Sequence, residues 1–369
     1  MIYLDCAATS FQKPPQVIRA AERAMRTLAS PGRGAYAEAM AAAEVMYSAR
    51  EAAAEFMGFS QSERVAFTMN ATHALNIAIR SLVSQGGRAV ISGFEHNAVL
   101  RPLHALGAKI DVAGRRLFDT DEMIREFKRH LPGAQAAVCT HVSNVFGYIL
   151  PIDEISRLCR ECGVPLIIDA SQSAGVLDID ADGTGAAFIA MPCHKSLLGI
   201  QGSGLLLCRE EPKPLLFGGT GGDSLSRQMP PYLPDSIEAG TQFPPAAAAL
   251  REGIAYIRRR GRESIARHER ELCRHMAELL RGREDTELFL GADGEQTGVL
   301  SFRSAKRDCE YIAAALGEER ICVRAGLHCA PLAHESAGTV DTGTVRMSFS
   351  PFNTHAEVEY TAEKLMNII

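Results

Sequence analysis

Residues 191–204 read MPCHKSLLGIQGSG and place Lys195 at the end of an apolar strand, just before a loop punctuated by glycines. In an open α/β fold, ligands bind beyond the carboxyl ends of the strands, which is where this lysine is expected. A lysine at such a position can form an imine with an aldehyde cofactor or substrate. A solvated lysine in a turn is the simpler explanation of Lys195 taken alone, so the rest of the chain has to decide.

Short apolar strands alternate with helical segments on the N-terminal side of this stretch. Strands are predicted at 65–69, 88–92, 109–113, 136–142, 165–169, 187–191 and 204–208, and helices at 14–29, 36–57, 72–83, 97–106, 121–130 and 152–162. Strands that read as continuous apolar runs between helices are typical of a mostly parallel, buried sheet. The sequence therefore predicts an α/β fold.

The pattern changes after Gly218. Residues 217–245 are rich in Gly and Pro and have no apolar period, which predicts either a linker or a functional loop. One long helical region, 246–281, is expected next. Strands at 298–302, 321–324 and 344–350 then alternate with helices at 308–317 and 354–366. We expect a large domain over 12–245 and a smaller α/β domain over 246–369, with residues 1–11 packing on the smaller one.

Composition narrows the function classes. The 369 residues carry a net charge of −5, which argues against a general nucleic-acid or anionic-membrane binder. No run of 18 apolar residues and no signal-peptide pattern is present. The ten cysteines have no disulfide-scaffold spacing, and Cys159 and Cys162 form a CxxC without a partner pair. We expect a cytoplasmic protein with reduced thiols and no metal site.

A strand-end carboxylate supports the interpretation of Lys195. Residues 165–173 read PLIIDASQS, an apolar strand that ends in Asp169, with Gln172 three residues on. Such a carboxylate can hold a protonated ring nitrogen, as pyridoxal phosphate requires. The alternative is that Asp169 is a helix N-cap. Because one further strand separates Asp169 from Lys195, the two side chains can converge on one crevice.

Two other strand ends supply the remaining parts of a pyridoxal phosphate site. In VAFTMNATHALNI, residues 65–77, a helix opens at Asn70, Ala71 and Thr72, and its amides with the Thr72 hydroxyl make a candidate phosphate cradle. The glycines of nucleotide-binding loops are absent there. His96, in SGFEHNA, could stack on a heteroaromatic ring, although a lone surface histidine is the commoner explanation of such a residue.

With these residues in place, the chain resembles the class V enzymes of the aminotransferase-like fold, which depend on pyridoxal 5'-phosphate, and among them cysteine desulfurases and selenocysteine lyases. The resemblance runs from LDCAATS at 4–10 to TVRMSFSPFNT at 344–354. It implies a fold-type-I transferase, similar to aspartate aminotransferase, that forms a homodimer.

The resemblance also implies roles for individual residues. Lys195 matches the Schiff-base lysine, Asp169 the pyridinium partner, Gln172 the residue near the phenolic oxygen, His96 the ring-stacking histidine and His194 a phosphate ligand. Asn144 matches the asparagine at the cofactor and substrate, Thr241 a threonine that reaches the neighbouring subunit's phosphate, Arg346 the arginine that binds the substrate carboxylate, and Arg324 and Arg33 further active-site arginines. A bidentate guanidinium–carboxylate pair is the physical reason for arginine at the carboxylate.

A second part of the resemblance concerns sulfur. Residues 323–332, VRAGLHCAPL, are similar to the RxGxHCxxP-type segment of the group II, SUF-like desulfurases, with Cys329 at the persulfide position. This implies conversion of L-cysteine to L-alanine, with the sulfur passed to an acceptor protein. The alternatives are a selenocysteine lyase acting on L-selenocysteine, another class V aminotransferase or epimerase, and a binder that lacks the cofactor. Cys6 and Cys193 replace the Asn and Gly usual in the family, and such extra thiols could relay or trap a persulfide.

Overall fold

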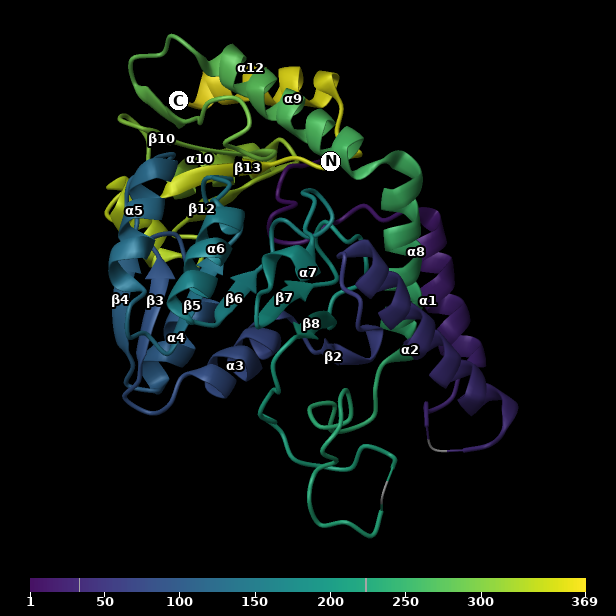
Figure 1. Ribbon diagram of the computed structural model, residues 1–369. Coiled ribbons are helices and arrows are strands. Elements are labelled where there is room, and N and C mark those ends of the chain that lie inside the picture. The colour runs from purple at the N-terminus through teal and green to yellow at the C-terminus, as the bar shows by residue number, and fades with distance from the viewer. Residues whose placement is uncertain (33, 223) are drawn as a thin grey trace.

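The computed structural model describes residues 1–32, 34–222 and 224–369. A seven-stranded sheet lies at its centre (Figure 1). Its strands are, in spatial order, β2 (Val65–Thr68), β8 (Gly204–Cys208), β7 (Phe188–Pro192), β6 (Leu166–Asp169), β5 (Ala136–Thr140), β3 (Arg88–Ser92) and β4 (Lys109–Ala113). All pairings from β7 to β4 are parallel, and β8 runs antiparallel to both of its neighbours. The predicted mostly parallel sheet is confirmed.

Helices cover both faces of this sheet (Figure 1). Along β5, Ala136 and Val138 belong to the core shared with α3 (Ala71–Leu82) and α4 (Asn97–Ala105). The alternate residues, Ala137 and Cys139, belong to the core on the opposite face. That core includes residues of α2 (Ala37–Phe56), α5 (Thr120–His130), α6 (Ile152–Cys162) and α7 (Ala181–Thr184). Burial on both faces explains why the strands read as unbroken apolar runs.

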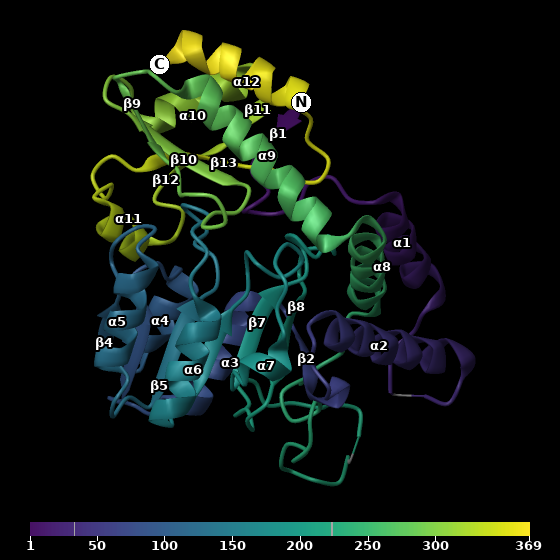
Figure 2. The same cartoon turned by 45° about the horizontal axis from the view of Figure 1, so that its top comes forward.

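A second core lies beyond the main sheet, at the top of Figure 2. Its antiparallel sheet has the order β12 (Arg324–Gly326), β13 (Thr344–Ser348), β10 (Val299–Ser304) and β9 (Thr286–Phe289). The helices that share this core are α9 (Arg262–Leu280), α10 (Cys309–Glu318) and α12 (His355–Ile368), whereas α11 (Pro331–Ala337) buries Leu332 and Ala333 in the cores of the main sheet. The N-terminal strand β1 (Ile2–Tyr3) pairs with β11 (Ile321–Cys322), and Leu4 is buried in this core. The chain's first residues thus pack on its last third.

The long helical region predicted over 246–281 is helical but not continuous. It is two helices, α8 (Pro244–Arg260) and α9, which meet at Gly261. Gly261 has a φ of +85°, a backbone conformation that glycine adopts without steric cost and other residues rarely enter. The break lets α8 pack beside α1 (Pro15–Thr27) and α2, while α9 turns away to cover the second sheet (Figure 2).

The described residues of 217–243 contain no helix or strand and project away from the main sheet (Figure 1), and the last two residues of the predicted segment, 244 and 245, already belong to α8. Their C-terminal end is tied back by Glu238, whose carboxylate accepts from two Arg50 nitrogens at 2.6 and 2.7 Å and from the Phe67 amide at 2.6 Å. The chain then enters α8, which packs on α1 and α2. This segment is therefore a long loop of the main-sheet layer rather than a linker between the two cores.

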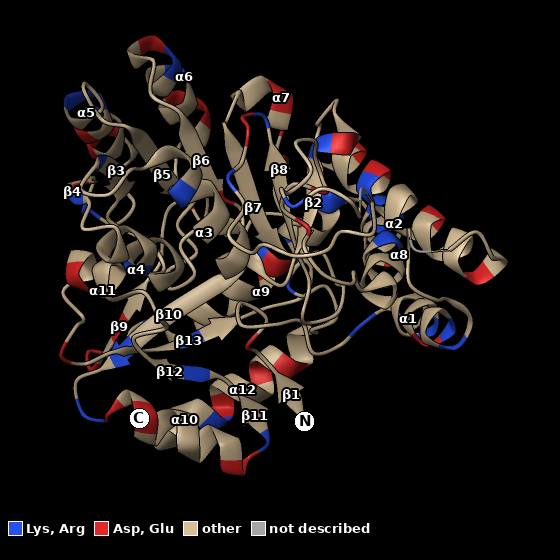
Figure 3. Cartoon of the chain, turned by 90° about the horizontal axis from the view of Figure 1, so that it is seen from below, with Lys and Arg blue, Asp and Glu red and all other residues tan. Residues whose placement is uncertain are grey.

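The surface carries charges of both signs. Figure 3 shows lysine and arginine interspersed with aspartate and glutamate along α2, α5 and α6. Within α5, Asp121 and Glu122 stand in the first turn and Lys128 and Arg129 in the last, which complements the helix dipole. Within the described ranges, no helix combines the length and apolar character needed to cross a bilayer.

Candidate active site

Five strand ends of the main sheet meet around one cavity. Residue pairs Thr140–Asp169 and Asp169–Ala190 stand opposite each other across β5, β6 and β7, so these strands end at one edge. The predicted residues that line the cavity are Ala71, Thr72, His96, Asn144, Asp169, Gln172, His194 and Lys195. Asn70, Ala98, Thr140, Val142, Ser171 and Pro192 complete its wall and were not predicted as site residues. Residues far apart in the sequence therefore converge because parallel strands share an edge.

Lys195 brings an amine into this cavity. Burial is the main cause that lowers the pKa of Lys195 to about 8; Asp169 opposes this shift, and Arg346 and Arg324 contribute to it. A depressed pKa gives the amine a sizeable neutral fraction near neutral pH, and the neutral amine is the nucleophilic form. The environment thus makes Lys195 a reactive group rather than a solvated turn residue.

Asp169 is 3% exposed, and its Oδ1 accepts a hydrogen bond from the Ser171 amide at 2.9 Å. The next helix, α7, begins only at Ala181, so Asp169 is not a helix N-cap. In the described part of the chain, Asp169 has no ion-pair partner. The Ser171 amide and the Lys195 charge offset part of its desolvation, and a positive or hydrogen-bonding group of a ligand would offset more.

The two histidines of the cavity are held by hydrogen bonds. His96 Nδ1 accepts from the Ala98 amide at 3.0 Å, which leaves the proton of the neutral ring on Nε2. His194 Nδ1 lies 2.9 Å from the Thr9 hydroxyl. Burial lowers the pKa of each ring to about 4, so both are neutral at pH 7. Flat, neutral rings suit stacking and hydrogen bonding rather than charge pairing.

The N-terminal segment underlies the same wall. Gln172 Nε2 donates to the Ala7 carbonyl at 2.9 Å. The Ser10 amide and the Lys13 ammonium both donate to the His194 carbonyl, at 3.1 Å each. Residues 7–13 therefore hold the Gln172 side chain and the backbone at His194, the residue before Lys195.

The start of α3 forms an anion cradle. Asn70 caps the helix by accepting from the His73 amide at 2.9 Å, and the first amides of a helix have no partner within it. A Cβ at Gly204 would lie 2.7 Å from the Asn70 carbonyl carbon and 2.8 Å from Thr68 Oγ1, so only glycine lets β8 approach this turn. Helix amides and the Thr72 hydroxyl suit a phosphate. Together with Lys195 and Asp169 they suit a phosphorylated aromatic aldehyde.

Arg346 is a fixed cation between the two sheets. It is 1% exposed; Nη1 donates to the Asn144 carbonyl at 2.9 Å, and Nη2 pairs with Asp5 Oδ1 at 2.6 Å. Its Nε is buried and lacks a hydrogen-bond partner in the described ranges. An unused donor on a buried guanidinium is suited to a carboxylate ligand. Asp5 was not predicted as a site residue, although it lies in the stretch LDCAATS that carries the resemblance.

Cys329 stands beside this cavity on a turn after β12. The side chain is exposed, and Arg324 Nη2 lies 3.7 Å from its sulfur. Its carbonyl accepts from the Asn97 amide at 2.8 Å, directly after His96. Arg324 is therefore near the cavity, as predicted, but its guanidinium faces the Cys329 thiol. Cys329 itself is not among the residues of the cavity wall.

Other predicted residues do not line the cavity. Arg324 and Arg346 lie beside it, and Thr241 lines a separate hollow with Met69, His73 and Gly202. Arg33 lies outside the described residues.

The two unusual cysteines near Lys195 are poor nucleophiles. Burial raises the pKa of Cys6 to about 12, and burial raises that of Cys193 to about 12 as well. The nucleophilic form of a cysteine is the thiolate, so both are unreactive at neutral pH. Cys6 lines a small hollow with Lys195 and Glu269.

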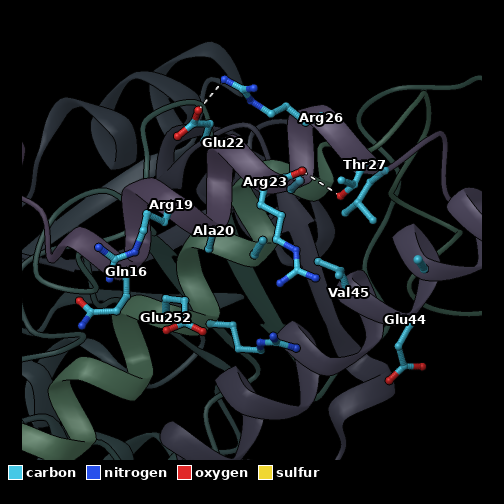
Figure 4. A pocket seen from close by; sticks show the side chains of 15 residues that line it. Gln16, Arg19, Ala20, Glu22, Arg23, Arg26, Thr27, Glu44, Val45 and Glu252 are labelled. Carbon is cyan, nitrogen blue, oxygen red and sulfur yellow. Dashed lines mark hydrogen bonds and ion pairs between the residues drawn. The ribbon is translucent and has the colours of Figure 1, made fainter.

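A second hollow lies far from these groups, between α1, α2 and α8 (Figure 4). Its wall carries Arg19, Arg23 and Glu252, and Arg26 pairs with Glu22 at 2.7 Å. Charges of both signs alternate, and neither cysteine nor lysine is among the lining residues. The concentration of reactive groups therefore favours the strand-end cavity as the active site.

Comparisons with known proteins agree with this geometry. A family model described as aminotransferase class-V matches residues 2–361. A probable cysteine desulfurase of Methanothermobacter thermautotrophicus is 31% identical over 100% of this chain and 94% of the relative, and one of Pyrococcus abyssi is 30% identical over 97% and 92%.

Solved structures agree as well. The apo structure of a cysteine desulfurase from Thermococcus onnurineus NA1 superimposes with a TM-score of 0.90 at 29% identity, covering 100% of this chain and 94% of that one. The match spans both sheets and every strand end of the cavity. The chain belongs to the aminotransferase class V family.

Proposed function

We propose that this protein is a pyridoxal-phosphate-dependent cysteine desulfurase that converts L-cysteine to L-alanine and leaves the sulfur on Cys329. One observation carries the proposal: a thiol contacted by a guanidinium stands beside a cavity that holds a pKa-lowered lysine. An aminotransferase or epimerase has no use for that thiol. The similarity to proteins named probable cysteine desulfurase supports the same reaction.

The cavity supplies a holder for each part of the cofactor. The α3 amides and Thr72 would bind the phosphate, with His194 beside it, and His96 would cover one ring face. Asp169 would hold the ring nitrogen in its protonated form. When bound, pyridoxal phosphate supplies an aldehyde carbon for an amine and an electron-withdrawing ring that weakens bonds at the substrate Cα.

Arg346 binds and orients the substrate. The guanidinium is held by Asp5 and the Asn144 carbonyl, so its remaining donors have a fixed direction. A substrate carboxylate that accepts from Nε completes the hydrogen bonding of Arg346 and places the amino acid between the arginine and Lys195. Lys195 Nζ then takes the proton from the substrate Cα and later returns one to the Cβ side.

Cys329 accepts the sulfur. Its thiolate attacks the substrate sulfur; the new S–S bond forms as the substrate Cβ–S bond breaks, and the bonding electrons stay on the carbon fragment. That fragment gains protons and leaves as alanine. The sum is L-cysteine plus enzyme thiol giving L-alanine plus enzyme persulfide, which balances. Arg324 Nη2 lies 3.7 Å from the Cys329 sulfur, where its donor can orient the attacking group.

The wider arrangement belongs to the same proposal. Two chains form a homodimer in which Thr241 serves the neighbouring subunit's phosphate, and the enzyme works in the cytoplasm. Residues 12–245 form the cofactor domain and residues 246–369 the smaller domain. The exposed side chain of Cys329 allows an acceptor protein to collect the sulfur.

The test measures both products on the cofactor-loaded enzyme. With L-cysteine and a thiol reductant, we expect alanine and sulfide in equal amounts, and peptide mass spectrometry should find one added sulfur atom on Cys329. Cys329→Ser should lose the persulfide and keep the cofactor absorbance, whereas Cys162→Ser, at another exposed cysteine, should change neither. Cofactor binding without alanine formation would refute the proposal.

A further inference from the structure

Three buried side chains form a line behind the Cys329 turn. His328 is 3% exposed, and His334 and Thr339 are fully buried. Thr339 Oγ1 lies 2.7 Å from His334 Nδ1, and His334 Nε2 lies 3.4 Å from His328 Nδ1. His328 Nε2 lies 3.3 Å from the carbonyl oxygen of Arg324. The line thus ends on the residue whose guanidinium contacts the Cys329 thiol.

The direction of every hydrogen bond in this line follows from its last acceptor, the Arg324 carbonyl. A carbonyl oxygen only accepts, so the proton of His328 is on Nε2. Burial lowers the pKa of both imidazoles, so each ring is neutral and carries one N–H. His328 Nδ1 therefore accepts from His334 Nε2–H, and His334 Nδ1 accepts from the Thr339 hydroxyl. Every donor points toward Arg324, and no other arrangement satisfies all three contacts.

The turn that this line supports is strained. His328 and Cys329 have φ values of +51° and +56°, two successive residues in the left-handed region. Neither residue is a glycine, so each needs surroundings that hold this conformation. The His328 carbonyl accepts from Asn144 Nδ2 at 2.9 Å, and the Cys329 carbonyl accepts from the Asn97 amide. Asn144 and Asn97 thus hold the two carbonyls of the turn. The line of His328, His334 and Thr339 supports its other side.

We infer that Thr339, His334 and His328 form a one-way chain of hydrogen bonds that positions the Cys329 thiol and the Arg324 guanidinium for sulfur transfer, an inference that rests on the proposed function. These residues are positioning residues, because none of them reaches the cavity. The chain fixes the ring of His328 and the carbonyl of Arg324. With both ends of the segment 324–329 fixed, the thiol meets the substrate sulfur in one orientation.

Thr339 offers the cleanest test, since it is remote from the thiol. Thr339→Val removes the first donor with little change in volume, whereas Thr339→Ser keeps it. Thr342→Val is a control at a neighbouring exposed threonine whose hydroxyl donates to the Gly343 carbonyl. Single-turnover persulfide formation on the cofactor-loaded enzyme is followed by rapid quenching and peptide mass spectrometry.

We expect Thr339→Val to slow persulfide formation about fivefold to tenfold, with KM for L-cysteine and the cofactor absorbance unchanged. Thr339→Ser and Thr342→Val should match the wild type. NMR of isotopically labelled histidine in the wild-type enzyme should show His328 and His334 both protonated on Nε2. In a second pair, His334→Gln keeps an N–H donor and should retain more activity than His334→Leu.

The outcomes separate the two proposals. Equal persulfide rates in Thr339→Val and Thr339→Ser, or an Nδ1-protonated His328, would overturn the chain while leaving the desulfurase reaction intact. A slower rate in Thr342→Val as well would do the same, because general loosening would then explain it. If the wild-type enzyme forms no persulfide on Cys329, the proposed function itself fails.

Discussion

The strand-end cavity and the Cys329 turn are built by different means. The cavity is made by topology, because five strands of one sheet end at a common edge and present their next residues there. The turn depends on hydrogen bonds between residues distant in the sequence, such as Asn144 to the His328 carbonyl, and on two left-handed residues. The cavity therefore tolerates local change, whereas each hydrogen bond of the Cys329 turn fixes part of the geometry of that turn.

The largest effect is expected in the cavity. Lys195→Ala removes both the amine that holds the cofactor and the group that moves the Cα proton, so turnover should fall by about 10⁴-fold. The absorbance of the bound cofactor should change as well, which Cys329→Ser should not cause. Turnover assays and absorption spectra of the two variants, purified with the cofactor, check this. Comparable turnover in Lys195→Ala and wild type would remove the cavity from the mechanism.

More of the cavity than of the Cys329 turn could be predicted from the sequence. Asp169, His96 and Lys195 follow apolar strands, and parallel strands bring such residues together, so their convergence could be predicted. The sequence did not reveal that Asp5 pairs with Arg346, because a partner 341 residues away leaves no local pattern.

The helix break at Gly261 was missed for a different reason. The flanking residues keep a helical pattern on both sides, and a lone glycine is tolerated inside a helix. The positive φ at Gly261 comes from the packing of α8 on α1 and α9 on the second sheet. Likewise, His334 and Thr339 carry no sequence pattern of their own, and only tertiary contacts place both in line with His328.

A smaller effect is expected at Arg346, which is proposed to bind the substrate carboxylate. Arg346→Lys keeps the charge and loses the fork of donors, so kcat/KM for L-cysteine should fall about 10²-fold, mainly through KM. Initial-rate kinetics over a range of L-cysteine concentrations measure this. Arg303→Lys, at a surface arginine paired with Glu287 at 2.6 Å, is the matched control and should change neither constant. An unchanged KM in Arg346→Lys would place the carboxylate elsewhere.

Asn144 lines the cavity and also donates to the turn, and we expect its substitution to change a rate by about tenfold. Asn144→Ala keeps the carbonyl that accepts from Arg346 and removes the amide that donates to His328, leaving a buried carbonyl unsatisfied. If the amide mainly serves the turn, persulfide formation should slow about tenfold with KM unchanged. A rise in KM with an unchanged persulfide rate would instead assign the amide to the substrate. Single-turnover and steady-state kinetics on one preparation separate the two outcomes.

The smallest effect concerns stability at the junction of the two regions. Glu269 is buried on α9, in the hollow that Lys195 and Cys6 line, and burial raises its pKa from 4.5 to about 8. Between those values the folded protein keeps a proton that the unfolded chain has lost. The free energy of unfolding should therefore fall as pH rises through this window, by up to about 1.4 kcal/mol per pH unit from this carboxyl.

Glu269→Gln removes that titration and keeps the shape of the side chain. The free energy of unfolding of the variant should depend less on pH than that of the wild type between about pH 5 and pH 8, and should exceed it at pH 8. Urea unfolding of the cofactor-loaded enzymes at several pH values measures the difference. Glu95, whose pKa burial also raises to about 8, is present in both proteins and cancels. Glu271→Gln, exposed on the same helix, should behave like the wild type. Parallel pH profiles for Glu269→Gln and the wild type would mean that Glu269 is ionised in the folded protein. The charge of Lys195, which lines the same hollow, would then offset that of Glu269.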